Sequence, residues 1–123
     1  MDKAQAIHQF WNSFGLIAYD ENTVPEDAAM PYITYYVSTG ALDQVQNLYA
    51  NLYYKSYSWE EITKKSDEIA KAVAEHGFYS IPLDNGYAMI TLGFPFAQRM
   101  NDPSDDTVRR MYLRVDAEFL TAY

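Results

Sequence analysis

The stretch that decides the fold is Met111-Tyr-Leu-Arg-Val-Asp-Ala-Glu-Phe119, close to the end of the chain. Apolar residues alternate there with polar or amphipathic ones. A period of two is typical of a β-strand that buries one face and leaves the other in water. We therefore expect residues 108–120 to form a long strand with one buried face.

The segment before this strand, Gly93-Phe-Pro-Phe-Ala-Gln-Arg99, combines two aromatic residues, an amide and an arginine. Turn-forming and acidic residues follow it, so we expect residues 93–107 to form a loop. A loop of this length is usually functional or disordered. The predicted protein contacts in it are Phe94, Phe96, Gln98 and Arg99. The alternative is that both Phe side chains pack on the core while the arginine pairs with a carboxylate.

The rest of the chain predicts two helices. Apolar residues at helical spacing indicate a helix over residues 2–14, with Asp2 as its cap and Gly15 at its end. The segment Ser58-Trp-Glu-Glu61 has the pattern of a capping box, which begins a second helix. That helix is expected to run to about residue 76 and to stop at Gly77.

Residues rich in β-branched and aromatic side chains favour strands over 32–38, 44–57 and 87–92. Residues 18–31 contain turn formers and two prolines, so we expect a loop there. The segment Asp84-Asn-Gly86 is a hairpin-turn signature. The predicted order is therefore α-β-β-α-β-β.

With 123 residues, the chain is long enough for one domain and too short for two. Two helices stacked on one face of a sheet would bury every apolar stripe described above. We predict a single domain over residues 1–123. Its fold class is α+β, with a four-stranded, mainly antiparallel sheet and two helices packed on one face.

The composition excludes several functional classes. The net charge is −8, which opposes tight binding to nucleic acid and to anionic membranes. No apolar run is long enough to span a membrane, and no signal peptide is visible. Cysteine is absent, so disulfides, thiolate metal sites and a cysteine nucleophile are excluded.

The residues needed for catalysis do not gather into a motif. His8 and His76 lie on separate predicted helices, whereas a zinc or iron site needs three or four ligands. The acidic pairs fall in predicted loops or on the wet side of a helix. No Gly-rich phosphate loop and no nucleophile elbow is present. We expect no catalytic centre, no metal and no cofactor.

Tyrosine is the most over-represented residue, with 12 copies. Tyrosine is enriched at protein interfaces because it combines apolar area with a polar tip. Tyr49 and Tyr53 lie on the less apolar face of the predicted strand 44–57, and Arg110 and Arg114 lie on the wet face of the last strand. We predict these four as interface residues. For the two arginines, salt bridges to neighbouring strands are the alternative.

Four segments, in their order and spacing, resemble the tail terminator (tail completion) proteins of long-tailed bacteriophages. The segments are Phe10-Trp-Asn-Ser-Phe-Gly15, Ala18–Pro25 through Met30–Tyr35, Ser58-Trp-Glu-Glu61, and Asp84-Asn-Gly-Tyr87 through Gly93–Arg99. A final strand that ends in Glu118-Phe-Leu-Thr-Ala-Tyr123 also fits. The resemblance covers most of the chain, but no single segment is a chemical signature.

The resemblance implies a small α+β domain that forms a ring, typically a hexamer. Such a ring caps the tail tube, stops its polymerisation and joins the tail to the neck of the head. The implied partners are copies of the chain, the tail tube protein and a head–tail connector protein. DNA passes through the ring without specific binding. The implied location is the virion, at the tail–neck junction, and the host cytoplasm during assembly.

An acidic subunit suits a channel for DNA, because a negative lumen does not bind phosphates. We expect this lumen to be lined by acids from two predicted loops. They are Asp20, Glu21, Glu26, Asp27, Asp102, Asp105 and Asp106. Two other classes stay open: a head-closure or head–tail adaptor protein of the neck, and a stand-alone small-ligand-binding or enzymatic α+β domain.

Overall fold

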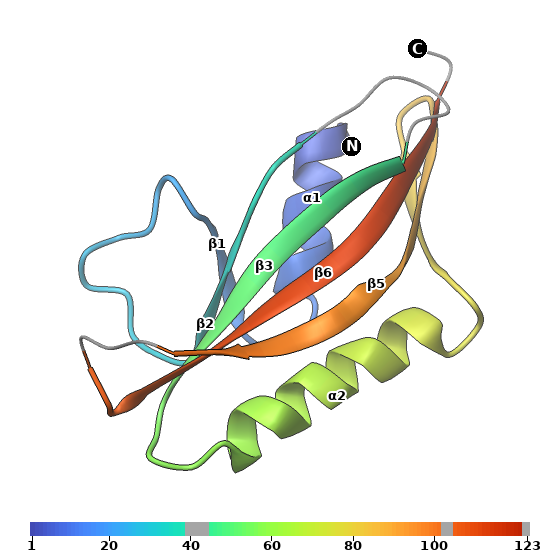
Figure 1. The fold of residues 1–123 in the computed structure, drawn as a ribbon. Coiled ribbons are helices and arrows are strands. Elements are labelled where there is room, and N and C mark those ends of the chain that lie inside the picture. The colour runs from blue at the N-terminus through green and yellow to red at the C-terminus, as the bar shows by residue number, and fades with distance from the viewer. Residues whose placement is uncertain (39–44, 102–104, 122–123) are drawn as a thin grey trace.

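The computed structural model describes residues 1–38, 45–101 and 105–121. Within these ranges the chain forms two helices and six strands, which Figure 1 labels. The elements are α1 Lys3–Asn12, β1 Ile17–Asp20, β2 Tyr32–Tyr35, β3 Val45–Lys55, α2 Glu60–Ala74, β4 Tyr79–Leu83, β5 Gly86–Met100 and β6 Val108–Thr121.

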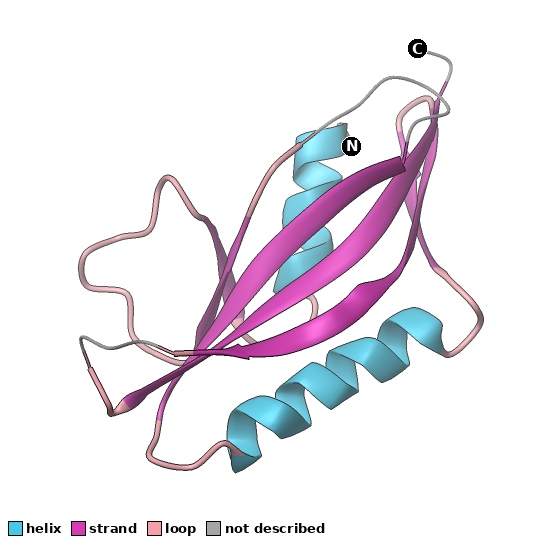
Figure 2. Cartoon of the chain, viewed as in Figure 1, coloured by secondary structure: helices cyan, strands magenta, loops and turns pink. Residues whose placement is uncertain are grey.

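The strands form one curled sheet in the order β1-β2-β3-β6-β5-β4 (Figure 2). Strands β1 and β2 are parallel, and the other neighbours are antiparallel. Strand β6 lies at the centre, paired with β3 along one side and with β5 along the other. The alternating stretch over residues 111–119 therefore lies in the middle of the sheet.

The core lies between the sheet and the two helices. The predicted stripe Ile7, Phe10, Trp11 and Phe14 of the first helix is buried, which confirms that prediction. Ile62, Ile69 and Val73 of α2 are buried as well, and both helices share one core cluster with β3 and β6. Burial alternates along β6 over its whole length. One face of the central strands is thus covered, and the other turns away from both helices.

The predicted four-stranded, mainly antiparallel sheet with the order α-β-β-α-β-β is wrong. Strand β1 lies inside residues expected to form a loop, and β4 precedes the predicted hairpin turn. Both are short strands at the two edges of the sheet. A short edge strand takes its conformation from pairing with its neighbour, so its own residue pattern is weak. Pro82 also weakens the pattern of β4, although proline is tolerated in an edge strand.

The predicted loop over residues 93–107 is also wrong in its first half, because β5 continues to Met100. Pairing with β6 shifts between Leu92 and Ala97, so residues 93–96 form a bulge opposite Arg114. A Cβ on Gly93 would lie 2.6 Å from Cγ of Arg114 and 2.8 Å from its backbone oxygen. The glycine is needed here because the two strands approach so closely.

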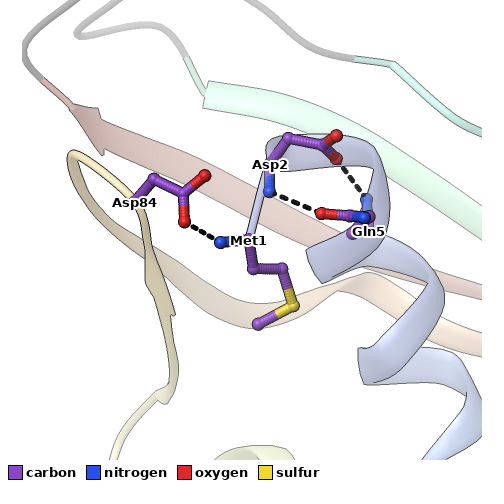
Figure 3. A network of polar contacts seen from close by, with 4 residues as sticks. All are labelled: Met1, Asp2, Gln5 and Asp84. Atoms are coloured by element: carbon purple, nitrogen blue, oxygen red, sulfur yellow. Dashed lines mark hydrogen bonds and ion pairs between the residues drawn. The ribbon is translucent and has the colours of Figure 1, made fainter.

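The cap predicted for the first helix is confirmed (Figure 3). Oδ1 of Asp2 accepts from the Gln5 N–H at 2.7 Å, and the Asp2 N–H donates to Oε1 of Gln5 at 3.0 Å. The terminal ammonium of Met1 pairs with Asp84 in the turn between β4 and β5. These contacts fix the start of α1 against that hairpin.

The capping box predicted for the second helix is not formed. Trp59 is the N-cap residue and its side chain makes no capping bond. The Ser58 hydroxyl instead accepts from the Glu60 N–H at 3.1 Å, one residue earlier than a capping box requires. Gly77, with φ +90°, follows the helix end and donates to Ala74 O at 3.0 Å, as predicted for a stop.

Candidate interaction surface

The face of the sheet that turns away from α1 and α2 is the candidate site, and we name it the outer face. It consists of every second residue on the central strands. Cross-strand neighbours on it are Tyr32 with Tyr53, Tyr53 with Arg110, Asn51 with Tyr112, and Tyr49 with Arg114. Most of these side chains are only half-buried. They are therefore partly open to a binding partner.

Six tyrosines gather on the outer face in two rows. In the first row, Tyr32 lies between Tyr19 and Tyr53, with ring centroids 5.7 and 5.2 Å apart. In the second row, Tyr49 lies between Tyr36 and Tyr112, at 4.8 and 5.6 Å, and its ring stacks on both neighbours. Cross-strand aromatic pairs of this kind hold the rings in fixed positions. The outer face is therefore a rigid aromatic surface.

Tyr49 is the best-connected residue of the second row. Its hydroxyl donates to Oε1 of Glu21 at 2.9 Å. Burial, this hydrogen bond and the negative charge of Glu21 raise the pKa of Tyr49 to about 12. The hydroxyl is therefore a neutral donor at physiological pH, and Glu21 is held against the outer face.

The two predicted arginines of β6 differ in their surroundings. Nη2 of Arg114 donates to Oδ1 of Asn47 at 3.2 Å and lies 3.7 Å from Oδ1 of Asp116. Its Nη1 lies 3.5 Å from the backbone oxygen of Phe94 in the bulge. Arg110, in contrast, has no carboxylate within ion-pair distance among residues 1–38, 45–101 and 105–121. Among the residues that the structure describes, the charge of Arg114 is thus compensated, whereas that of Arg110 is not.

The outer face also holds polar atoms that are covered but not hydrogen-bonded. The described part of the chain has seven such side-chain atoms, and four of them lie on this face. They are Oδ1 of Asn51, Nε of Arg110, Nε of Arg114 and Oδ1 of Asp116. A covered polar group without a partner costs free energy. Of these four atoms, Oδ1 of Asp116 takes part in the ion pair with Arg114, and the other three have no hydrogen-bond partner among the described residues.

The structure divides the residues predicted in the segment before β6. Gln98 is on the outer face, opposite Tyr112. Phe94 is 92% exposed at the bulge, and Phe96 packs against the core. The exposed Phe94 therefore fits the prediction of a protein contact, and Phe96 fits the alternative of packing on the core.

Arg99 lies on the opposite side of β5 from Gln98. It pairs with Met111, which is buried, so its side chain is on the face of the sheet that the helices cover. Its guanidinium lies 4.9 Å from the centre of the Trp59 ring, and that of Arg109 lies 5.4 Å from the same ring. The contact is a cation–π contact, and Arg99 does not join the outer face.

The predicted lumen acids are spread over several places. Asp20 ends β1 and accepts from the Asn22 N–H at 2.9 Å. Glu26 and Asp27 are exposed in the loop after β1. Asp102 lies outside the described residues. No described contact joins these positions, so which acids line a channel stays a prediction.

The two remaining acids come just before β6. Asp105 and Asp106 are both exposed. The hydroxyl and N–H of Thr107 both donate to Oδ1 of Asp105, at 2.6 and 2.9 Å. These hydrogen bonds lower the pKa of that carboxyl, which therefore stays negatively charged at neutral pH.

Four tyrosines of the outer face, Tyr19, Tyr32, Tyr36 and Tyr112, were not singled out from the sequence. Each occupies an outward position in or next to its strand, so the period of two was a usable signal. The pattern could not give the register of the sheet, which places residue 49 between residues 36 and 112.

No other part of the described structure gathers reactive groups. Within residues 1–38, 45–101 and 105–121, no three His, Asp or Glu side chains lie close enough to hold a metal ion. An open groove of about 660 Å³ runs along α1, lined by Met1, Ala4, Gln5, His8, Gln9 and Asn12. Nδ1 of His8 lies 2.8 Å from the Tyr35 hydroxyl beside this groove. The outer face remains the surface with the most unmet interactions.

Comparison with known protein families found no matching family model, and comparison with curated proteins found no similar sequence. Neither helix in the described ranges is long and apolar enough to cross a membrane.

Proposed function

We propose that this chain is a structural protein of a long-tailed bacteriophage or prophage. In this proposal it is a tail terminator, which forms a hexameric ring, caps the tail tube, ends tube polymerisation and joins the tail to the neck of the head. The observation that supports association most directly is the outer face, with its fixed tyrosines, uncompensated Arg110 and unpaired polar atoms. The more specific role rests on the resemblance of the four sequence segments.

The outer face supports association because of what it would gain. Tyrosine and arginine are the residues that contribute most to protein interfaces. A rigid aromatic surface loses little conformational entropy when a partner binds. The partner would also supply hydrogen bonds to atoms that have none in the single chain. A catalytic role has no comparable support among the described residues, where no three His, Asp or Glu side chains gather.

The test of this function is deletion of the gene from the phage that carries it, followed by electron microscopy of the particles. A terminator predicts abnormally long tails that are not attached to heads. DNA-filled heads beside detached tails of normal length would instead identify a head-closure or adaptor protein. Normal particles would contradict both roles and favour a stand-alone domain. A copy of the gene supplied in trans should restore normal tails if the deletion itself is the cause.

A further inference from the structure

Arg110 is a half-buried cation of the outer face that has no counter-charge among the described residues. It lies between Tyr53 on β3 and Met100 on β5, and its Nε atom is covered without a hydrogen-bond partner. Arg114, four residues further along β6, already contacts Asn47 and Asp116. A half-buried guanidinium favours a carboxylate, which it can bind through two parallel hydrogen bonds.

The described chain also carries carboxylates without counter-charges. Residues 21–31 connect β1 to β2, and Figure 1 shows this loop projecting away from the sheet at the β1 side. Within it, the Ala28 N–H donates to Pro25 O at 3.2 Å, which closes a turn with Glu26 and Asp27 at its centre. Both acids are exposed, and neither forms an ion pair with a described residue.

We propose that the outer face of one copy binds the acidic turn 25–28 of a second copy, with Arg110 paired to Glu26 and Asp27. This inference rests on the proposed function and names the two surfaces that meet in the ring. Strands β2 and β3 separate β1 from β6 within one chain, so the turn meets Arg110 of another copy. The tyrosines beside Arg110 would exclude water from the ion pair and so strengthen it.

This contact joins two different surfaces, so it is heterologous. Heterologous contacts close into a ring when the rotation between copies allows it. The contact therefore generates the assembly that a terminator needs, whereas a face that bound only itself would give a dimer. It also removes Glu26 and Asp27 from the channel and leaves the turn with Asp105 and Asp106 as the candidate lining.

Single-stranded nucleic acid is the other ligand that aromatic rows and arginines can bind. Two observations favour a protein carboxylate instead. The chain has a net charge of −8, and the outer face itself carries Glu21, Asp116 and Glu118. These charges repel carboxylates as well as phosphates, but a strand of nucleic acid needs several cations along its length, whereas a short turn with two carboxylates needs only the local charge of Arg110.

The test uses two charge-reversal variants of the full chain, Arg110→Glu and the double variant Glu26→Arg/Asp27→Arg. Each alone places like charges in the contact, so its dissociation constant for self-association should rise about tenfold or more. An equimolar mixture of the two variants should assemble again, because every contact in an alternating ring then has opposite charges. Sedimentation velocity gives the dissociation constants, and native mass spectrometry gives the number of copies.

Lys64→Glu, at an exposed position of α2, is the matched control and should assemble like the wild type. Thermal unfolding shows whether each variant is folded. If Arg110→Glu does not fold, the loop variant still decides the outcome, since exposed positions in a loop tolerate such changes. The loop variant should fail to assemble by itself. It should assemble when the same chain also carries Arg110→Asp, because the two sides of the contact then have opposite charges again.

The outcomes separate this inference from the proposed function. Wild-type rings that neither variant weakens would overturn the contact while leaving the ring in place. If the mixture of the two variants assembles only into dimers, that result would contradict the heterologous geometry of the contact. A wild-type chain that stays monomeric up to its solubility limit would overturn both. Binding of a single-stranded oligonucleotide that Arg110→Glu abolishes, with self-association unchanged, would reassign the outer face to nucleic acid.

Discussion

At the scale of single residues, the hydroxyl of Tyr49 gives a pH-dependent contribution to stability. The pKa of this group is raised from its usual value near 10 to about 12, so the native state holds the proton more tightly than the unfolded state. The contribution is therefore complete below pH 10 and is lost as the pH rises from about 10 to about 12. Tyr49→Phe should cost about 0.5–1.5 kcal/mol at pH 7, because the bond to Glu21 is lost.

The measurement is the free energy of unfolding of both proteins in urea at several pH values. The difference between wild type and Tyr49→Phe should shrink as the pH rises above 10. Tyr57→Phe, at a position that is 76% exposed, is the control and should match the wild type throughout. A difference that grows with pH would contradict the assignment of the hydrogen bond to Glu21.

The burial of single residues could be predicted from the sequence, but their contacts across the sheet could not. The alternation in the last strand correctly predicted that Leu113, Val115 and Ala117 are buried. The outer positions were also assigned correctly for Tyr49, Tyr53, Arg110 and Arg114. Tyr49 stacks on Tyr36 and on Tyr112, which come from other segments of the sheet, and only the register of the sheet brings these rings together.

Truncation of two apolar side chains should have very different effects on the free energy of unfolding. Leu113 is fully buried in β6, so Leu113→Ala should lower the free energy of unfolding by about 2–5 kcal/mol. Phe94 is 92% exposed at the bulge, so Phe94→Ala should change stability by less than about 0.5 kcal/mol. Phe94 is also a predicted protein contact, so Phe94→Ala should raise the dissociation constant for self-association about tenfold or more. Unchanged association would remove it from the interface.

At the scale of elements, the long and strongly patterned segments were predictable and the short ones were not. Both helices were placed within a few residues of their observed bounds, because each has an apolar stripe at helical spacing. Strands β1 and β4 are too short to show a pattern of their own. The second half of β5 was missed because Gly93 and Pro95, read locally, favour a loop. Pairing with β6 overrides that local preference and turns the segment into a bulge.

The bulge in β5 makes Gly93 a sensitive position. Gly93→Ala would place a Cβ within 2.8 Å of the backbone oxygen of Arg114, so the two strands would have to separate. We expect a loss of about 1–3 kcal/mol in the free energy of unfolding, similar to overpacking a core. Ser80→Ala, at an exposed position of β4, should change it by less than about 0.5 kcal/mol. Chemical denaturation compares the two, and equal stabilities would contradict the close approach of β5 and β6.

At the scale of the whole molecule, the sheet divides the protein into a covered side and an open side. The two helices and one face of the strands form a single core, and the outer face carries the tyrosines. The α and β content was predictable from the sequence, but the six-stranded order was not, since it depends on the two short edge strands. The open side is what gives the proposed ring its contact surface.

A ring around DNA should depend on the sign of the charge at its lumen. With Glu26 and Asp27 assigned to the contact between copies, Asp105 and Asp106 are the described candidates for the lining. Replacing both with Lys should leave the ring intact and slow DNA ejection, because lysines bind phosphates and release them less readily at low salt. Replacing Glu26 and Asp27 with Lys should instead prevent assembly. Ejection kinetics that do not change in the Asp105 and Asp106 variant would contradict a lumen at this turn.

The central claim is that this chain acts by binding copies of itself through its open sheet face. The most direct measurement is the mass of the assembly formed by the purified wild-type chain, alone and with the tail tube protein from the same genome, by native mass spectrometry. The account predicts a closed ring, hexameric as the resemblance implies, in which the outer-face tyrosines become less accessible to a tyrosine-directed chemical label on assembly. A chain that stays single under both conditions, with those tyrosines equally accessible, would contradict it.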